Sequence, residues 1–170
     1  MEDIHQYLTF RMGTEEYALC VSNVKEILVV PSITRIPRMP DYMTGVINLR
    51  GTVVPVIDLK KKLGMGDTEV AAETAIIVTE IPNGSEGAGG MLTLGVFADA
   101  VHKVITIERD SIEPPPSIGL DIATDFIAGM GHSEGGFITI LDITQILSAD
   151  DFPDEQGLEI AENASEAKEP

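Results

Sequence analysis

Two aspartates, one cysteine and three histidines are the side chains in this sequence whose types could do chemistry. Asp58 and Asp142 could serve as the paired carboxylates of general acid–base catalysis, and Cys20 could serve as a nucleophile. The histidines have no metal-ligand spacing to one another or to the cysteine; they are His5, His102 and His132. The pattern brings together no nucleophile, base and oxyanion-binding group, which predicts that the protein is not an enzyme. We likewise expect no metal and no cofactor.

A glycine-rich run at residues 84–90 is a further place where a ligand could bind, because such loops can cradle phosphates. The run has neither the lysine nor the following serine or threonine of a P-loop. Strand-like segments flank it on both sides, whereas a phosphate cradle opens a helix. We therefore predict a hairpin loop here.

The elements that must position these residues occur twice along the chain. Residues 51–59 resemble residues 135–143, with every pair 84 positions apart, and residues 18–20 resemble residues 95–97 at a distance of 77 positions. The two aspartates occupy equivalent positions, each just before a short run predicted to be helical, which favours helix N-caps over an acid–base pair. The cysteine corresponds to Phe97, which favours a place in the core over nucleophilic chemistry.

Each half of the repeat is predicted to be rich in β-strands. Between residues 4 and 12 apolar and polar side chains alternate, which indicates a strand with one buried face. Two short helices are expected, at residues 59–63 and 143–147. Turn residues separate the remaining strand-like runs, which lie at 17–21, 26–30, 45–49, 52–57, 75–81, 91–98, 103–107 and 136–141. The pattern favours two small five-stranded barrels packed side by side.

Charge divides the chain into regions of opposite sign. The net charge of −17 argues against nucleic acids and anionic membrane surfaces as partners. Residues 148–170 hold eight acids and one base, a composition that predicts a disordered tail and favours a solvating role over partner binding. Residues 25–62 hold seven bases and three acids, so this segment is where we expect an acidic partner surface to bind.

Three features predict a soluble protein of the cytoplasm. The single cysteine fits a reducing compartment. The first residues are acidic where a secretory signal would be basic. The longest apolar runs are far shorter than the roughly 20 residues that a membrane span needs, so we expect no direct membrane insertion.

The run Gly-Val-Ile-Asn-Leu-Arg-Gly at residues 45–51, followed by Val-Pro-Val-Ile-Asp-Leu at residues 54–59, closely resembles the signature of the CheW family. Val-Lys-Glu-Ile at residues 24–27 and Ile-Ala-Gly-Met-Gly at residues 127–131 accompany it in the family's order, and the resemblance covers roughly residues 4–147. It implies two SH3-like five-stranded β-barrels with short helices that share a hydrophobic core. It also implies that the first strand pairs with the second barrel.

We therefore expect an all-β fold with one CheW-like domain, residues 4–147, and a tail, residues 148–170. Within the domain, subdomain 1 is expected at about residues 13–74. Subdomain 2 is expected at about residues 4–12 plus residues 75–147.

The resemblance implies non-enzymatic adaptor work in chemotaxis, a two-component signalling system. Proteins of this family couple the cytoplasmic tip of methyl-accepting chemoreceptors to the regulatory domain of the histidine kinase CheA, in arrays on the inner face of the membrane. Matching family positions imply a receptor-binding surface that consists of Val24, Glu26, Gly45, Asn48, Arg50 and Gly51. The kinase-binding surface is expected at Ile27, Leu28 and Val29.

Arg50 is open to two interpretations. It lies in a tight turn between two predicted strands, where Gly51 permits a positive φ, and its repeat counterpart is Glu134, so the fold itself does not require an arginine. A forked hydrogen bond from Arg50 to a partner is favoured over an internal ion pair. Three rival interpretations of the whole chain stay open: a fragment of the kinase, an adaptor joined to a receiver domain, and a small-molecule-binding barrel pair or enzyme.

Overall fold

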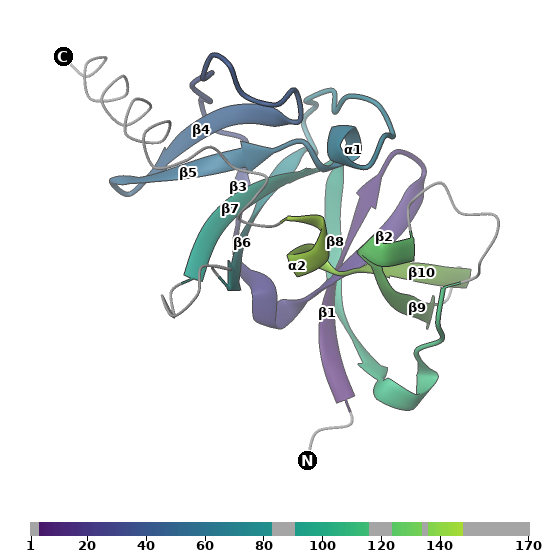
Figure 1. Ribbon diagram of the computed structural model, residues 1–170. Coiled ribbons are helices and arrows are strands. Elements are labelled where there is room, and N and C mark those ends of the chain that lie inside the picture. Colours follow the sequence, from purple (N-terminus) through teal and green to yellow (C-terminus); the bar gives the residue numbers. More distant parts are fainter. Residues whose placement is uncertain (1–3, 83–90, 116–123, 134–135, 148–170) are drawn as a thin grey trace.

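The computed structural model describes residues 4–82, 91–115, 124–133 and 136–147, and this part of the chain forms two five-stranded sheets (Figure 1). The first sheet has the strand order β3 (Val24–Val29), β6 (Ala75–Pro82), β7 (Met91–Ala98), β5 (Thr52–Ile57), β4 (Met43–Leu49). The second sheet has the strand order β8 (Ala100–Glu108), β1 (Ile4–Met12), β2 (Glu15–Cys20), β10 (Gly136–Leu141), β9 (Ile127–Ser133). The predicted all-β class is confirmed.

Short helices follow β5 and β10 at the two positions predicted. They are α1 (Leu59–Lys62) and α2 (Ile143–Ile146). The described residues also form three single-turn 3₁₀ helices, which are η1 (Val21–Asn23), η2 (Arg109–Ser111) and η3 (Thr124–Phe126). The Asp58 carboxylate accepts a hydrogen bond from the backbone N–H of Lys61, and the Asp142 carboxylate accepts from those of Thr144 and Gln145. Both aspartates are therefore helix N-caps, and the interpretation as an acid–base pair is wrong.

Each sheet has the SH3-like form but is open along one seam. β3 and β4 are the edge strands of the first sheet, and β8 and β9 are those of the second. The described residues thus form barrels that backbone hydrogen bonds do not close. Side chains cover the seam of the first barrel instead, because Leu28 of β3 and Leu49 of β4 pack against the same buried cluster.

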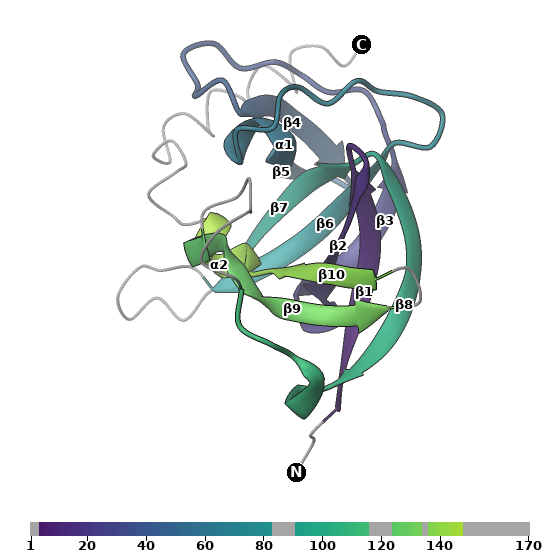
Figure 2. The ribbon, with the colours of Figure 1, turned by 90° about the vertical axis from the view of Figure 1, so that its right-hand side faces the viewer.

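The two halves of the repeat exchange their first hairpins. By the repeat, β1 and β2 correspond to β6 and β7, while β3, β4 and β5 correspond to β8, β9 and β10. The strand order of one sheet becomes that of the other when each strand is replaced by its counterpart. The hairpin β1–β2 thus lies in the sheet of the second half, and β6–β7 lies in the sheet of the first (Figure 2).

Sheet membership differs from the subdomain boundaries expected from the sequence. The first sheet takes its strands from residues 24–98, and the second from residues 4–20 and 100–141. The expected pairing of β1 with the second barrel is present, but β2 accompanies it, and β6 and β7 lie in the first barrel. The physical reason is the tight turn after Met12, which pairs with Glu15: a two-residue loop leaves β2 beside β1.

The predicted shared core is confirmed by the largest buried cluster, which joins the two sheets. It contains Phe10 and Leu19 from the hairpin β1–β2 and Ile77 and Leu94 from the hairpin β6–β7. Both helices contribute to the same cluster, and α2 lies between the two sheets in Figures 1 and 2. Two smaller clusters each fill one barrel only. Each exchanged hairpin therefore buries one face in its own barrel and the other in the shared core.

Asp99 fixes the point where the chain passes from the first sheet to the second. Its Oδ2 atom accepts a hydrogen bond of 2.6 Å from the backbone N–H of Gly13, in the β1–β2 turn. The same oxygen lies 3.4 Å from Nζ of Lys60 on α1, and the two side chains are only 13% and 16% exposed. One carboxylate therefore ties together elements of both sheets.

Candidate functional site

The turn between β4 and β5 positions the residues of the signature run. Leu49 pairs with Thr52, so Arg50 and Gly51 form a two-residue loop with φ angles of 52° and 88°. Two successive positive φ angles are typical of a type I′ hairpin turn. The Oδ1 atom of Asn48 accepts a hydrogen bond of 2.8 Å from the backbone N–H of Gly51. Asn48 therefore stabilises the turn that presents the arginine.

Arg50 forms a forked ion pair with Glu26 across the open seam of the first barrel. Its Nη1 atom lies 3.3 Å from Oε1 of Glu26, and its Nη2 atom donates to the other carboxylate oxygen. Glu26 lies on β3 and Arg50 follows β4, the two edge strands of the same sheet. This is the internal ion pair that the sequence favours less than a partner contact. The guanidinium remains accessible all the same, because the Arg50 side chain is 70% exposed.

The ion pair shifts the protonation equilibria of both partners. The hydrogen bond from the Arg50 guanidinium lowers the pKa of Glu26, and the carboxylate in turn raises the pKa of Arg50. Both groups therefore keep their charges at neutral pH. A partner that binds here meets a fixed acid beside a fixed base.

Val24 and Gly45 are held by packing and take no part in the ion pair. Val24, at the start of β3, packs against the largest core cluster. Gly45 is buried on β4, where a Cβ atom would overlap the carbonyl oxygen of Thr34 and lie 2.9 Å from a methyl group of Ile33. Its repeat counterpart Gly129 is crowded in the same way by Ile112. Close packing therefore accounts for both glycines.

The expected kinase-binding residues lie on both faces of β3. Ile27 and Val29 point outward, with 44% and 86% of their surfaces exposed. Leu28 faces inward and packs against the cluster that fills the first barrel. A partner can therefore contact Ile27 and Val29 directly, whereas Leu28 supports the strand from below. Val104, the repeat counterpart of Ile27, is an exposed apolar residue on the second barrel.

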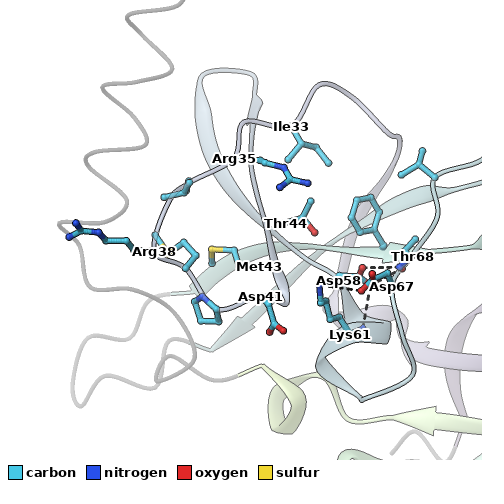
Figure 3. Close-up of a pocket in the computed structure, with 15 residues that line it drawn as sticks. Ile33, Arg35, Arg38, Asp41, Met43, Thr44, Asp58, Lys61, Asp67 and Thr68 are labelled. Atoms are coloured by element: carbon cyan, nitrogen blue, oxygen red, sulfur yellow. Dashed lines mark hydrogen bonds and ion pairs between the residues drawn. The ribbon is translucent and has the colours of Figure 1, made fainter.

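The structure also contains a pocket that the sequence does not reveal (Figure 3). Its volume is about 550 Å³, and the segment before β4, the start of α1 and the segment after α1 surround it. Arg35 and Arg38 line it on one side, and Thr68 lines it on the other, where it donates hydrogen bonds to the Asp58 carboxylate. The only signal in the sequence is the basic composition of residues 25–62.

The described residues offer little for catalysis or metal binding. Within them, no group of three histidine, cysteine, aspartate or glutamate side chains could hold a metal ion. His102 and His132 each contact a glutamate, Glu16 and Glu113, at 2.7 Å. Cys20 is half-buried, with its Sγ atom 3.1 Å from the hydroxyl of Ser22. Across the described part of the chain, no helix combines the length and apolar character that crossing a membrane requires.

The described residues thus form two open β-barrels, the first of which carries exposed apolar side chains beside an exposed ion pair. A family model described as the CheW-like domain matches residues 6–151. The chemotaxis protein CheW of Bacillus subtilis is 34% identical over 141 residues, which cover 82% of this chain and 85% of that protein. The chemotaxis protein CheW of Klebsiella aerogenes is 31% identical over 147 residues, which cover 86% of this chain and 84% of that protein.

A solved structure agrees with these relatives. The crystal structure of the scaffolding protein TtCheW from Thermoanaerobacter tengcongensis matches with a TM-score of 0.76 at 34% identity, over 91% of this chain and 95% of that one. This chain belongs to the CheW-like family, and with it to the non-catalytic scaffold proteins of chemotaxis signalling. The resemblance inferred from the signature run is thereby confirmed.

Proposed function

We propose that this chain couples the cytoplasmic tips of chemoreceptors to the regulatory domain of the histidine kinase CheA. The family supports adaptor work, and the observation that carries the finer proposal is the exposed turn at Arg50. Its φ of 52° is a left-handed conformation that L-residues other than glycine and asparagine seldom adopt. A turn selected for stability alone would hold asparagine or glycine at this position. Arginine there serves contacts outside the turn.

The proposed receptor surface is the group around the ion pair. Glu26, Asn48, Arg50 and Gly51 converge at the seam of the first barrel, and Val24 borders this group on β3. Gly45 takes part indirectly, because its packing sets the course of β4. The guanidinium can form two parallel hydrogen bonds to a carboxylate or to carbonyl groups at the end of a helix.

The proposed kinase surface is the outer face of β3. Ile27 and Val29 lie on this face, one strand position apart from the inward-facing Leu28. Exposed apolar side chains on an edge strand favour burial against another protein. Glu26 and Ile27 are consecutive on β3 and project from opposite faces of this edge strand, so one adaptor can contact receptor and kinase on the two sides of the strand.

The site of action we propose is the cytoplasmic side of the membrane, in receptor arrays. The net charge of −17 opposes direct binding to anionic lipid or nucleic acid, so association with the membrane would run through the receptors. Arrays of this kind bring receptor, adaptor and kinase into one assembly.

A charge-swap experiment tests the role of Arg50. The variants are Arg50→Glu, Glu26→Arg and the double variant, measured in arrays reconstituted with receptor signalling fragments and CheA. We expect Arg50→Glu to reduce receptor binding about tenfold or more, as loss of an interface hot spot does. The double variant restores opposite charges at the seam and should regain the melting temperature, but not the receptor-stimulated kinase activity.

Two results would contradict this assignment. Unchanged kinase activation by Arg50→Glu would remove Arg50 from the coupling surface. Full recovery of coupling in the double variant would show that Arg50 acts only through its ion pair with Glu26. For the kinase surface, Val29→Asp should weaken CheA binding, with Met91→Asp as the control because Met91 is an exposed apolar residue on β7.

A further inference from the structure

The pocket beside α1 combines basic and apolar side chains. Arg35 and Arg38 line it together with apolar residues, which are Ile33, Ile36, Met39, Met43, Val70 and Phe97. Figure 3 shows the Arg35 guanidinium between Ile33 and Thr44, and Arg38 at the rim, directed outward. Such a lining suits a peptide that carries both carboxylates and apolar side chains.

The two arginines have no acidic partner within the described residues, whereas five other basic side chains there do. Those five pairs are Arg11–Glu73, Lys25–Glu80, Arg50–Glu26, Lys60–Asp99 and Lys61–Asp67. Lys103 and Arg109 also have no carboxylate partner in the described part of the chain, but they lie on or beside β8, whereas Arg35 and Arg38 line one pocket. Arg38 is in addition held at a φ of 63°, an unfavourable backbone conformation that is often retained for function.

The acids that line the pocket already have partners inside it, with one exception. Asp58 accepts hydrogen bonds from the N–H and hydroxyl of Thr68, and Asp67 lies 3.2 Å from Nζ of Lys61. Counted as whole charges, Asp41, Asp58 and Asp67 balance Arg35, Arg38 and Lys61, so the pocket is neutral overall and only its Arg35–Arg38 side is basic. An acidic occupant would therefore contact this basic side of the pocket.

We propose that the acidic C-terminal segment of the same chain, residues 148–170, binds this pocket through contacts of its carboxylates with Arg35 and Arg38. The segment has a net charge of −7 and three large apolar residues, Phe152, Leu158 and Ile160, which matches the mixed lining. It begins directly after Leu147, which packs in the same core cluster as Leu59 and Leu63, the residues on either side of the lysines of α1.

The length of the segment is sufficient for this contact. Its 23 residues can extend to about 75 Å, whereas a folded body of about 145 residues is roughly 40 Å across. Figures 1 and 2 both show α2, where the segment starts, on the same side of the molecule as α1. A tether of this kind produces an effective concentration of about 1 mM, so the contacts are populated where their combined dissociation constant is about 1 mM or lower.

The test uses the full-length chain with a spin label in the segment. The cysteine variant C20S/Q156C carries the label, and broadening of amide signals in isotope-labelled protein reports proximity. At low salt we expect broadening of the amides around the pocket, including those of Thr34 and Thr44. The broadening should disappear at 0.5 M salt, where the electrostatic screening length is about 4 Å. It should also disappear in the charge-removing variant R35Q/R38Q.

A matched control removes equal charge elsewhere. Lys103 and Arg109 are on or beside β8 and, within the described residues, have no carboxylate partner, so K103Q/R109Q should leave the broadening intact. The salt dependence of the amide chemical shifts in the isotope-labelled natural chain, without a spin label, provides a second measurement that needs no substitution. No broadening at the pocket, or equal loss in both double variants, would overturn the proposal.

Mixed samples distinguish the two possible occupants of the pocket, which are the segment of the same molecule and the segment of a second copy. Spin-labelled chains without isotope are combined with isotope-labelled chains without spin label. Broadening that survives in this mixture would assign the pocket to a second copy of the chain and would refute binding within one molecule. Failure of this proposal leaves the coupling role of Arg50 untouched, because Arg50 does not line the pocket.

Discussion

Replacing Gly45 by alanine should destabilise the fold strongly, because the new Cβ atom would overlap the carbonyl oxygen of Thr34. That oxygen accepts a 2.8 Å hydrogen bond from the N–H of Val46, and the N–H of Thr34 donates a second 2.8 Å bond to the carbonyl of Val46. The backbone must move to admit the methyl group, and both hydrogen bonds would be strained. Overpacking against backbone costs about 1–3 kcal/mol, and each weakened hydrogen bond adds about 0.5–1.5 kcal/mol.

A total of about 3 kcal/mol would lower the melting temperature by about 6–12 °C in a chain of this size. Gly64→Ala is the matched control, because Gly64 has a φ of 77° but open space around its position. That variant should lose only about 1 kcal/mol, the usual cost of a left-handed alanine, or about 2–4 °C. Thermal unfolding followed by circular dichroism measures both.

The same variant separates packing from partner contact. If Gly45 acts through packing, any loss of receptor binding in G45A should accompany a loss of stability. A melting temperature equal to that of the natural chain, combined with lost receptor binding, would refute the reasoning. Gly129→Ala repeats the test in the second barrel, where Ile112 takes the place of Ile33.

Three further predictions concern single side chains. Asp58→Ala should cost about 2 kcal/mol in chemical denaturation, because it removes an N-cap and the acceptor for Thr68. Because the pKa of Glu26 is lowered from its ordinary value of 4.5, its pair with Arg50 stabilises the fold at pH values above 4.5, and this stabilisation is lost as the pH falls through the pKa of the folded state. The stability difference between the natural chain and Arg50→Gln should therefore be present at pH 7 and vanish on acidification. Asp99→Ala should cost about 2 kcal/mol, since the Gly13 N–H loses its acceptor and a half-buried ammonium loses its partner.

The local elements of this fold follow from the sequence, because local physics determines them. The repeat spacing placed both helices within one residue of their ends, and an aspartate before each helix predicted the N-caps. Alternation located the first strand. Pro55 shows where such rules stop: a proline within a strand indicates an edge or bulge position, yet β5 lies inside the sheet. Its missing N–H is tolerated because pairing with β7 begins only at Val56.

Long-range features could not be predicted in the same way. An internal repeat is compatible with hairpins that stay in their own half or exchange, and the two-residue loop after Met12 keeps β2 beside β1 in either arrangement. The contact of Glu26 with Arg50 joins opposite edges of a sheet, so it depends on curvature that no residue pattern encodes. The pocket arginines became evident only when their surroundings were known.

The exchange of hairpins makes the two barrels circular permutants of each other. The strands of the first barrel follow one another in the chain as β3, β4, β5, β6, β7. Their equivalents in the second barrel are β8, β9, β10, β1, β2, so the last two equivalents come first in the chain. The connection from Leu63 to Ala75 in the first barrel therefore corresponds, in the second, to the gap between the end of α2 and the start of β1. Joining that gap with about ten residues and opening the chain near Gly66 would exchange the roles of the two barrels while every sheet kept its strand order.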